Sequence, residues 1–155
     1  MFIFGEFECK ADAKGRFLMP AALLKQLPED ERQSFVINRG LDDCLALYPE
    51  KVWQEELTKI YSQNQFVAEN RTFARLFQAG AVPVSLDGSN RLLVPKKLAE
   101  HASIEKELVL IGSGNKIEIW SQARFEAQLQ DHLPRLADIS ERVMGGTRPT
   151  PTPDA

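Results

Sequence analysis

The chain has 155 residues, which is enough for one compact domain or two very small ones. Its content of 43% hydrophobic and 26% charged residues is typical of a soluble globular protein, and the apolar N-terminal stretch is too short for a signal peptide. No apolar run approaches the roughly 20 residues of a membrane span. We therefore expect a cytoplasmic protein that has no membrane partner. The net charge of -3 weakens a nucleic-acid reading without excluding it, because phosphate contact depends on where positive charges cluster.

The elements predicted for the first part of the chain are short strands and helices. Two strands flank a tight turn at Asp12–Arg16, whose Gly15 supplies a permissive backbone. Pro20 precedes a short helical run at 21–24. Two further strands, near 36–37 and 45–48, lead to a longer helix that begins near Pro49.

A linking helix then stops at Gly80, and a second series of elements follows. Its turn contains Asp87 and Gly88, with Gly88 as the permissive residue, and Pro95 precedes another short helix. The alternation of Ile117–Trp120 is typical of a half-buried strand, and a longer helix begins near Ser121.

The two series are copies of one unit, and a shorter loop in the second copy is the one gap needed to align them. The positions that agree are Asp12 with Asp87, Arg16 with Arg91, Pro20 with Pro95, Leu23 with Leu98, Val36–Ile37 with Leu108–Val109, Gly40 with Gly112, and Leu45–Tyr48 with Ile117–Trp120. We assign residues 1–64 to the first repeat, 65–81 to the linking helix, 82–143 to the second repeat and 144–155 to a disordered tail. Each repeat is too small to be stable alone, so we expect the two to share one core.

No constellation for catalysis or metal binding is evident. Cys9 and Cys44 lack the spacing of a zinc site or a disulfide framework, and His101 and His132 lie in no metal-ligand spacing. No nucleophile–base pair and no phosphate-cradling glycine loop are present. We therefore expect no enzyme activity, no cofactor, no metal and no small-molecule substrate.

The paired Asp-x-x-x-Arg motifs, each followed by proline, resemble the MraZ family of the AbrB/MazE-like swapped-hairpin superfamily. Further carriers of the resemblance are Arg39–Pro49 and Arg75–Ala81. The resemblance covers nearly the whole chain, to about Val143. It implies an α+β fold in which two tandem AbrB/MazE-like β-rich repeats form one pseudo-symmetric swapped-hairpin β-barrel with flanking helices.

The resemblance also implies a function. MraZ-like proteins are transcriptional regulators encoded with the bacterial division and cell-wall gene cluster. They bind G-rich direct repeats in double-stranded promoter DNA, associate with the nucleoid, and assemble as homo-oligomeric rings. The alternative is an antitoxin-like or scaffold protein that binds another protein, although such antitoxins usually carry one copy and a disordered toxin-binding tail.

Six residues are the candidates for DNA binding, and they are Asp12, Lys14, Arg16, Asp87, Arg91 and Lys10. A planar arginine fork matches the guanine acceptors, whereas Lys14 suits a phosphate and Lys10 would widen the basic surface. The aspartates would accept turn N–H groups and pair with the arginines, since like charges keep them from phosphates.

The second turn departs from the family pattern, because Asp87–Arg91 loses the lysine and moves the glycine. This turn would either contact DNA more weakly or serve mainly to hold the barrel. Taken without the resemblance, an Asp-x-x-x-Arg motif is most simply a surface ion pair worth under about 1 kcal/mol.

Overall fold

A computed structural model describes residues 1–146 and divides them into two units. The first unit comprises residues 1–122 and holds every strand described, whereas the second begins at Ala123 and is helical. None of the helices within residues 1–146 has the length and apolarity of a membrane span. Residues 147–155, which make up most of the predicted tail, lie outside the described residues.

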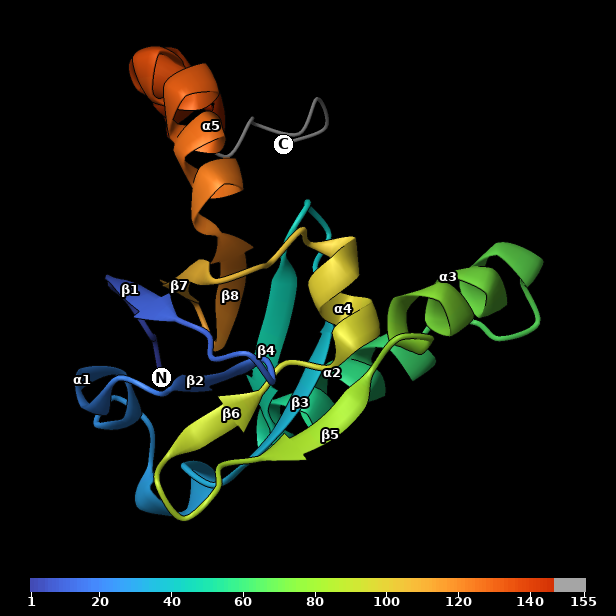
Figure 1. Ribbon diagram of the computed structural model, residues 1–155. Coiled ribbons are helices and arrows are strands. Elements are labelled where there is room, and N and C mark those ends of the chain that lie inside the picture. The colour runs from blue at the N-terminus through green and yellow to red at the C-terminus, as the bar shows by residue number, and fades with distance from the viewer. Residues whose placement is uncertain (147–155) are drawn as a thin grey trace, which may run out of the picture. The chain divides into compact units, whose positions relative to one another are not determined.

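The first unit contains two successions of elements joined by a helix (Figure 1). The first succession comprises β1 (Glu6–Lys10), β2 (Arg16–Leu18), α1 (Ala21–Leu24), the 3-10 turn η1 (Glu29–Glu31), β3 (Ser34–Arg39), β4 (Leu45–Pro49) and α2 (Glu50–Tyr61). The linking helix is α3 (Ala68–Gln78). The second succession comprises β5 (Val82–Ser85), β6 (Arg91–Leu93), α4 (Lys96–His101), β7 (Glu107–Ser113) and β8 (Lys116–Ser121). This order of strands and helices confirms the order predicted from the sequence.

The second unit consists of short helices that follow one another directly. They are α5 (Gln122–His132), the 3-10 turn η2 (Leu133–Arg135), α6 (Leu136–Ser140) and the π-helical turn η3 (Glu141–Gly145). The helix predicted to begin near Ser121 is therefore confirmed. The tail predicted from residue 144 begins inside η3, so only its residues beyond Gly146 remain as a prediction.

The strands of the two successions are exchanged within one antiparallel six-stranded sheet, whose order is β1-β7-β8-β4-β3-β5. β1 does not pair with β3 of its own copy but with β7 of the other copy, and β5 correspondingly pairs with β3. The hairpins β3–β4 and β7–β8 meet along β4 and β8. Neither copy therefore completes its own sheet.

β2 and β6 form a separate two-stranded antiparallel ribbon, which contains one strand from each copy. Phe17 pairs with Leu92 at its centre, so Arg16 lies opposite Leu93 and Arg91 lies opposite Leu18. The pairing is symmetric about Phe17 and Leu92, which is the relation expected if a pseudo-two-fold axis passes through the ribbon.

One hydrophobic core lies between the ribbon and the sheet, and both copies contribute to it. Phe17 and Leu92 enter it from the ribbon, while Leu45 and Ile117 enter it from the sheet. A smaller cluster on the other face of the first hairpin contains Trp53 of α2, against which Phe77 of α3 stacks at 5.7 Å between ring centroids. The predicted single shared core is confirmed.

The predicted match of Val36 with Leu108 is wrong by one residue. By their register against the neighbouring strands, Phe35 corresponds to Leu108 and Ile37 to Leu110, and all four lie in the core. Val36 instead lies in the smaller cluster on the opposite face. Because successive side chains of a strand point to opposite faces, a shift of one residue exchanges the buried face for the other.

The same shift changes the residue that corresponds to Gly112. Arg39 pairs with Leu45, and Gly112 pairs with Ile117, the equivalent of Leu45. Gly112 therefore corresponds to Arg39, whereas the sequence pattern matched it with Gly40. The cause is the hairpin loop after the third strand, which is one residue longer in the first copy.

The α+β class and the mostly antiparallel sheet agree with the prediction. Within residues 1–146, the six-stranded sheet runs from β1 at one edge to β5 at the other and does not close on itself. A closed swapped-hairpin barrel is therefore not established by the strand pairing.

Candidate nucleic-acid interface

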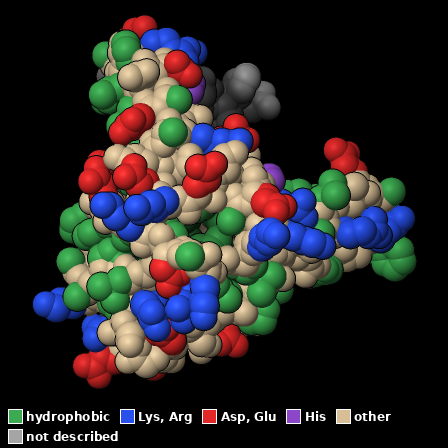
Figure 2. Space-filling model, in the orientation of Figure 1, with side chains coloured by type: hydrophobic (Ala, Val, Ile, Leu, Met, Phe, Trp, Pro, Cys, Tyr) green, Lys and Arg blue, Asp and Glu red, His purple; other side chains and the backbone are tan. Residues whose placement is uncertain are grey.

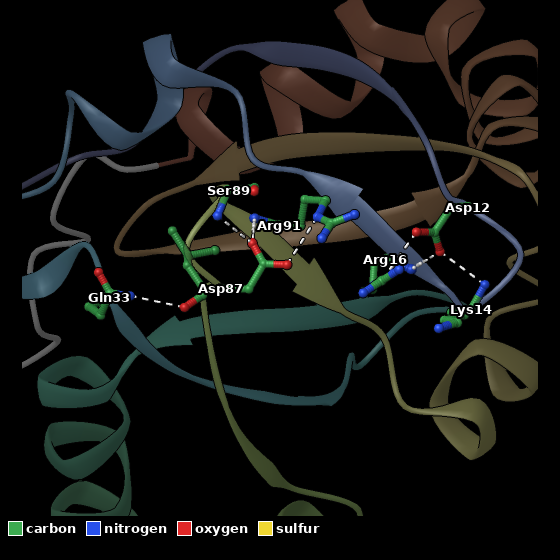
Figure 3. A network of polar contacts seen from close by, with 8 residues as sticks. Asp12, Lys14, Arg16, Gln33, Asp87, Ser89 and Arg91 are labelled. Atoms are coloured by element: carbon green, nitrogen blue, oxygen red, sulfur yellow. Dashed lines mark hydrogen bonds and ion pairs between the residues drawn. The ribbon is translucent and has the colours of Figure 1, made fainter.

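The turn between β1 and β2 is organised by one carboxylate (Figure 3). Oδ1 of Asp12 accepts the backbone N–H of Lys14 and of Arg16, each at 2.9 Å, and Oδ2 accepts Nε–H of Arg16 at 3.1 Å. The main chain of Asp12 closes the turn, since its N–H donates to the Arg16 carbonyl at 2.8 Å. The side chain thus shapes the turn and directs the arginine at once.

The turn between β5 and β6 repeats this arrangement although its sequence differs. Oδ1 of Asp87 accepts the backbone N–H of Ser89 and of Arg91, each at 2.9 Å, and Oδ2 accepts Nε–H of Arg91 at 3.0 Å. The predicted structural role of both aspartates is therefore confirmed. The altered second turn keeps the geometry of the first.

The residue of the second turn that adopts positive φ is Asn90, whereas the sequence pattern predicted Gly88. Gly15 has φ +85° and Asn90 has φ +60°, whereas Gly88 is not among the residues of positive φ. Asn90 occupies the place of Gly15 in the repeat, and each donates its N–H to the aspartate carbonyl of its own turn at 3.0 Å. Asparagine tolerates the left-handed region better than most residues, which explains how the turn persists without its glycine.

Each turn is also fastened to the opposite copy. The carbonyl of Gly15 accepts the N–H of Val94 at 2.9 Å, and the carbonyl of Asn90 accepts the N–H of Met19 at 2.9 Å. Val94 and Met19 are both buried. The two turns are consequently rigid extensions of the β2–β6 ribbon.

One face of the ribbon carries both arginines, and the opposite face enters the core. Arg16 and Arg91 share the outer face with Leu18 and Leu93, whose side chains are 62% and 47% exposed. In Figure 2, Lys and Arg side chains gather over β2 and β6 with acidic side chains beside them. The exposed leucines were missed from the sequence, although their spacing of two residues from each arginine places them on the same face.

The arginines keep donors available for a ligand. Their side chains are 31% and 38% exposed, and within residues 1–146 only Nε of each guanidinium donates to a protein acceptor. The terminal nitrogens therefore remain as a planar fork of N–H donors. Such a fork suits the paired acceptors of a guanine edge or the oxygens of a phosphate.

The electrostatics of the turns favour charged aspartates. Hydrogen bonds from the Arg16 and Lys14 backbone lower the pKa of Asp12, and the Arg16 side chain adds to that effect. Hydrogen bonds from the backbone of Arg91 and of Ser89 likewise lower the pKa of Asp87, and the Arg91 side chain adds to that effect. Both aspartates thus remain ionised and paired with their arginines at neutral pH.

The two predicted lysines differ in their surroundings. Lys14 lies in the first turn, is exposed, and lines a groove of about 520 Å³ with Gly15 and Lys96. Lys10 is exposed at the end of β1, where it lies opposite Glu107 in the sheet register. The structure therefore brings Lys14 beside the arginine face, whereas Lys10 lies next to an acidic residue.

Neither cysteine has the surroundings of a reactive thiol. Burial raises the pKa of Cys9 to about 11, and burial together with nearby acidic groups raises that of Cys44 to about 12. Thiols with such pKa values stay protonated at neutral pH. Within residues 1–146, no three His, Cys, Asp or Glu side chains gather as a metal ion requires.

Comparison with known proteins places this geometry in a family. The model of the MraZ protein family, described as antitoxin-like, matches residues 2–76 and again residues 77–145. A transcriptional regulator MraZ of Flavobacterium psychrophilum is 43% identical over 92% of this chain and 92% of its own length. Proteins of the same name from Christiangramia forsetii and Pediococcus pentosaceus are 42% and 38% identical, over 92% and 90% of this chain and 93% and 95% of their own lengths. The two matched segments divide the chain near the end of α3, where the repeats meet, and this chain therefore belongs to the MraZ family.

Proposed function

We propose that this chain is a sequence-specific DNA-binding transcriptional regulator, and that its arginine face reads double-stranded promoter DNA. The observation that carries the proposal is the ribbon face on which Arg16 and Arg91 stand, each held by an aspartate and each with free terminal N–H groups. The major groove of DNA admits a two-stranded β-ribbon, and an arginine fork fits O6 and N7 of guanine.

The roles of the candidate residues follow from their geometry. Arg16 reads a base edge, Lys14 neutralises a phosphate, and Asp12 holds the arginine without touching the DNA. Arg91 and Asp87 repeat the arrangement, which supports a DNA contact by the second turn as well. Lys10 contributes little, since Glu107 lies opposite it.

In this proposal, the protein binds DNA as a homo-oligomeric ring. A single ribbon makes few contacts, and the net charge of -3 opposes a strong hold on DNA. Several subunits that engage spaced G-rich direct repeats together gain avidity through effective concentration. The proposed place of action is the cytoplasm, at the nucleoid, on the promoter of the division and cell-wall gene cluster.

The proposal includes the swapped-hairpin barrel as the support of the site. The ribbon and the six-stranded sheet would form its two walls, since Phe17 and Leu92 of the ribbon share one core with both hairpins. The exchange of β1 and β5 between the copies supports the same arrangement. In such a barrel both arginine turns project from a single rigid body.

The test compares Arg16→Ala and Arg16→Lys with the parent chain, using a duplex from directly upstream of its own gene and a scrambled duplex. Arg16→Lys keeps the charge but loses the fork, so it should lose discrimination worth about 1–3 kcal/mol, or roughly 5- to 150-fold, with little change in salt dependence. Arg16→Ala should lose the same discrimination and some salt dependence. Arg71→Ala, a charge change on α3, is the matched control.

Unchanged preference for the promoter duplex in both Arg16 variants would refute the proposal. Binding that is independent of salt and directed to a protein partner would support the antitoxin-like or scaffold alternative. Thermal unfolding of each variant shows whether a loss of binding arises from a loss of structure.

A further inference from the structure

A second basic site lies beside the arginine face, where the linking helix approaches α4. It is a cavity of about 540 Å³, and its charged lining side chains are Arg39 from β3 and Lys96 and Lys97 from α4, with His101 beside them. No Asp or Glu lines this cavity. Within residues 1–146, neither the arginine nor the two lysines make an ion pair.

The position of Arg39 depends on Gly80. A Cβ at residue 80 would lie 2.8 Å from Nε of Arg39, so the guanidinium lies directly against the glycine backbone. The linker is held at the same place, because Nδ2 of Asn38 donates to the carbonyl of Phe77 at 2.6 Å. Residues far apart in the sequence are thus held together around the cavity.

The internal repeat shows that the fold does not need these charges. At the pseudo-symmetric place the equivalent positions are neutral, and they are Gly112 of the second copy for Arg39, and Ala21, Ala22 and Gln26 of the first copy for Lys96, Lys97 and His101. The same two-stranded and helical framework forms on both sides. The cationic side chains, Arg39 from the first copy and Lys96 and Lys97 from the second, are therefore additions at one of the two equivalent places.

The pseudo-symmetric place, which Gly112 and Gln26 border, is closed by the N-terminal segment. The backbone of Phe4 lies so close to Gly112 that a Cβ there would meet it at 2.5 Å. The side chain of Gln26 holds this segment, since it accepts from the Phe4 N–H and donates to the Phe4 carbonyl. The cavity and its charges exist on one side only of the pseudo-two-fold axis.

The basic site continues into the groove of the first turn. Lys96 lines both cavities, so a series of cations runs from Lys14 through Lys96 to Lys97 and Arg39. Glu105 also lines the groove of the first turn. Figure 2 shows a second group of Lys and Arg side chains where α4 and α3 meet. Like charges that lie close together repel one another, and a bound anion reduces that repulsion.

We propose that the cavity of Arg39, Lys96 and Lys97 binds a phosphodiester group of the DNA strand that passes the first turn. The inference rests on the proposed function and extends its contact by one site. Lys14, whose counterpart is the neutral Ser89, lies on the same side as the cavity. Both additions of charge thus strengthen one end of the ribbon.

The consequence is a direction of binding. The two arginine turns are nearly equivalent, so a ribbon with only these contacts would sit on DNA in either orientation. Phosphate contacts fix the orientation of a protein on the duplex. A phosphate site at one end favours a single orientation, which head-to-tail recognition of direct repeats requires.

The test measures affinity against salt for Arg39→Gln with Lys97→Gln, on the upstream duplex and on a scrambled duplex. Glutamine keeps part of each side-chain stem, and circular dichroism checks the fold. Each lost phosphate contact should make the negative slope of log K against log salt shallower by about 0.9 for each protein site bound to the DNA. The loss of affinity should be equal on both duplexes. Lys25→Gln with Lys51→Gln removes the same charge from two exposed positions outside both cavities and should leave the slope closer to that of the parent chain.

Equal slopes for the two double variants would overturn the phosphate site while leaving the proposed function intact. If the parent chain shows no preference for the promoter duplex, the proposed function is overturned. The slopes of log K against log salt on scrambled DNA would still test the phosphate site in the cavity. Calorimetry with inorganic pyrophosphate distinguishes a soluble anion from a DNA phosphate as the ligand of the cavity. Pyrophosphate binding that the Arg39 and Lys97 changes abolish, with unchanged DNA slopes, would assign the cavity to a soluble anion and overturn the proposal.

Discussion

At the scale of single residues, each turn depends on a carboxylate that makes three hydrogen bonds and on one residue of positive φ. The first copy uses Gly15 at that position and the second uses Asn90, with φ of +85° and +60°. The aspartate contacts are the same in both. The geometry of the turn is therefore kept by two different solutions to one steric problem.

Substitution of Gly15 should reveal this steric requirement. Gly15→Ala should destabilise the protein by about 1–2 kcal/mol, because alanine is strained at positive φ. Its Cβ would also lie 3.3 Å from the Val94 carbonyl oxygen. Gly15→Asn should cost less, since asparagine occupies the equivalent place in the second turn. Urea unfolding measures both, and an equal loss for the two variants would contradict this explanation.

The aspartates also predict how stability depends on pH. A carboxyl whose folded pKa lies below its ordinary value of 3.8 stabilises the fold fully above that value, and this stabilisation is lost as the pH falls through the folded pKa. Stability should thus fall below about pH 4, and Asp12→Asn with Asp87→Asn should make that fall shallower. Chemical denaturation at several pH values is the measurement. Asp30→Asn with Asp131→Asn, at two exposed positions, is the control.

At the scale of elements, strand alternation gives the β2–β6 ribbon an exposed face and a buried face. Arg16 and Leu18 face outward, whereas Phe17 between them is 1% exposed and lies in the core. The backbone bonds of the turns to Val94 and Met19 tie each strand to the other copy. The ribbon is consequently held by the core beneath it and by both turns.

Adjacent positions on β2 should respond differently to truncation. Phe17→Ala should destabilise the protein by about 3–5 kcal/mol, because it removes a buried ring and leaves a cavity. Leu18→Ala, at a side chain that is 62% exposed, should change stability by less than about 0.5 kcal/mol. Urea unfolding of both variants tests the assignment of faces, and a reversed order would show that the ribbon register is wrong.

At the scale of the whole molecule, the exchange of strands makes the two copies depend on each other. β1 needs β7, β5 needs β3, and β2 needs β6. All three pairings join residues of different copies, and the main core draws on both. Residues 1–122 therefore form one compact unit, although the sequence is a tandem repeat, and we expect this unit to unfold cooperatively.

Fragments should demonstrate this dependence. Residues 1–64 and 65–143, expressed separately, should each lack stable structure, because each of the four strands in either fragment loses a partner. Mixing the two should restore strand signal in circular dichroism and dispersed amide resonances. A first fragment that folds alone as a monomer would contradict the exchanged pairing.

The sequence alone determined the repeat, the order of the elements and the structural role of Asp12 and Asp87. These features depend on contacts between residues close in the chain, such as the aspartate and the N–H groups two and four positions later. Spacing, turn residues and alternation report such contacts directly.

The tertiary structure decided which strand pairs with which, the one-residue shift that places Ile37 beside its core neighbours, and the cavity at Arg39. Each of these depends on residues from distant segments, and many pairings of the same strands satisfy the same local pattern. Only packing into a common core selects one of them. The basic cavity shows this most clearly. Arg39, Gly80 and Lys97 are far apart in the sequence, and only the folded chain places them around one cavity.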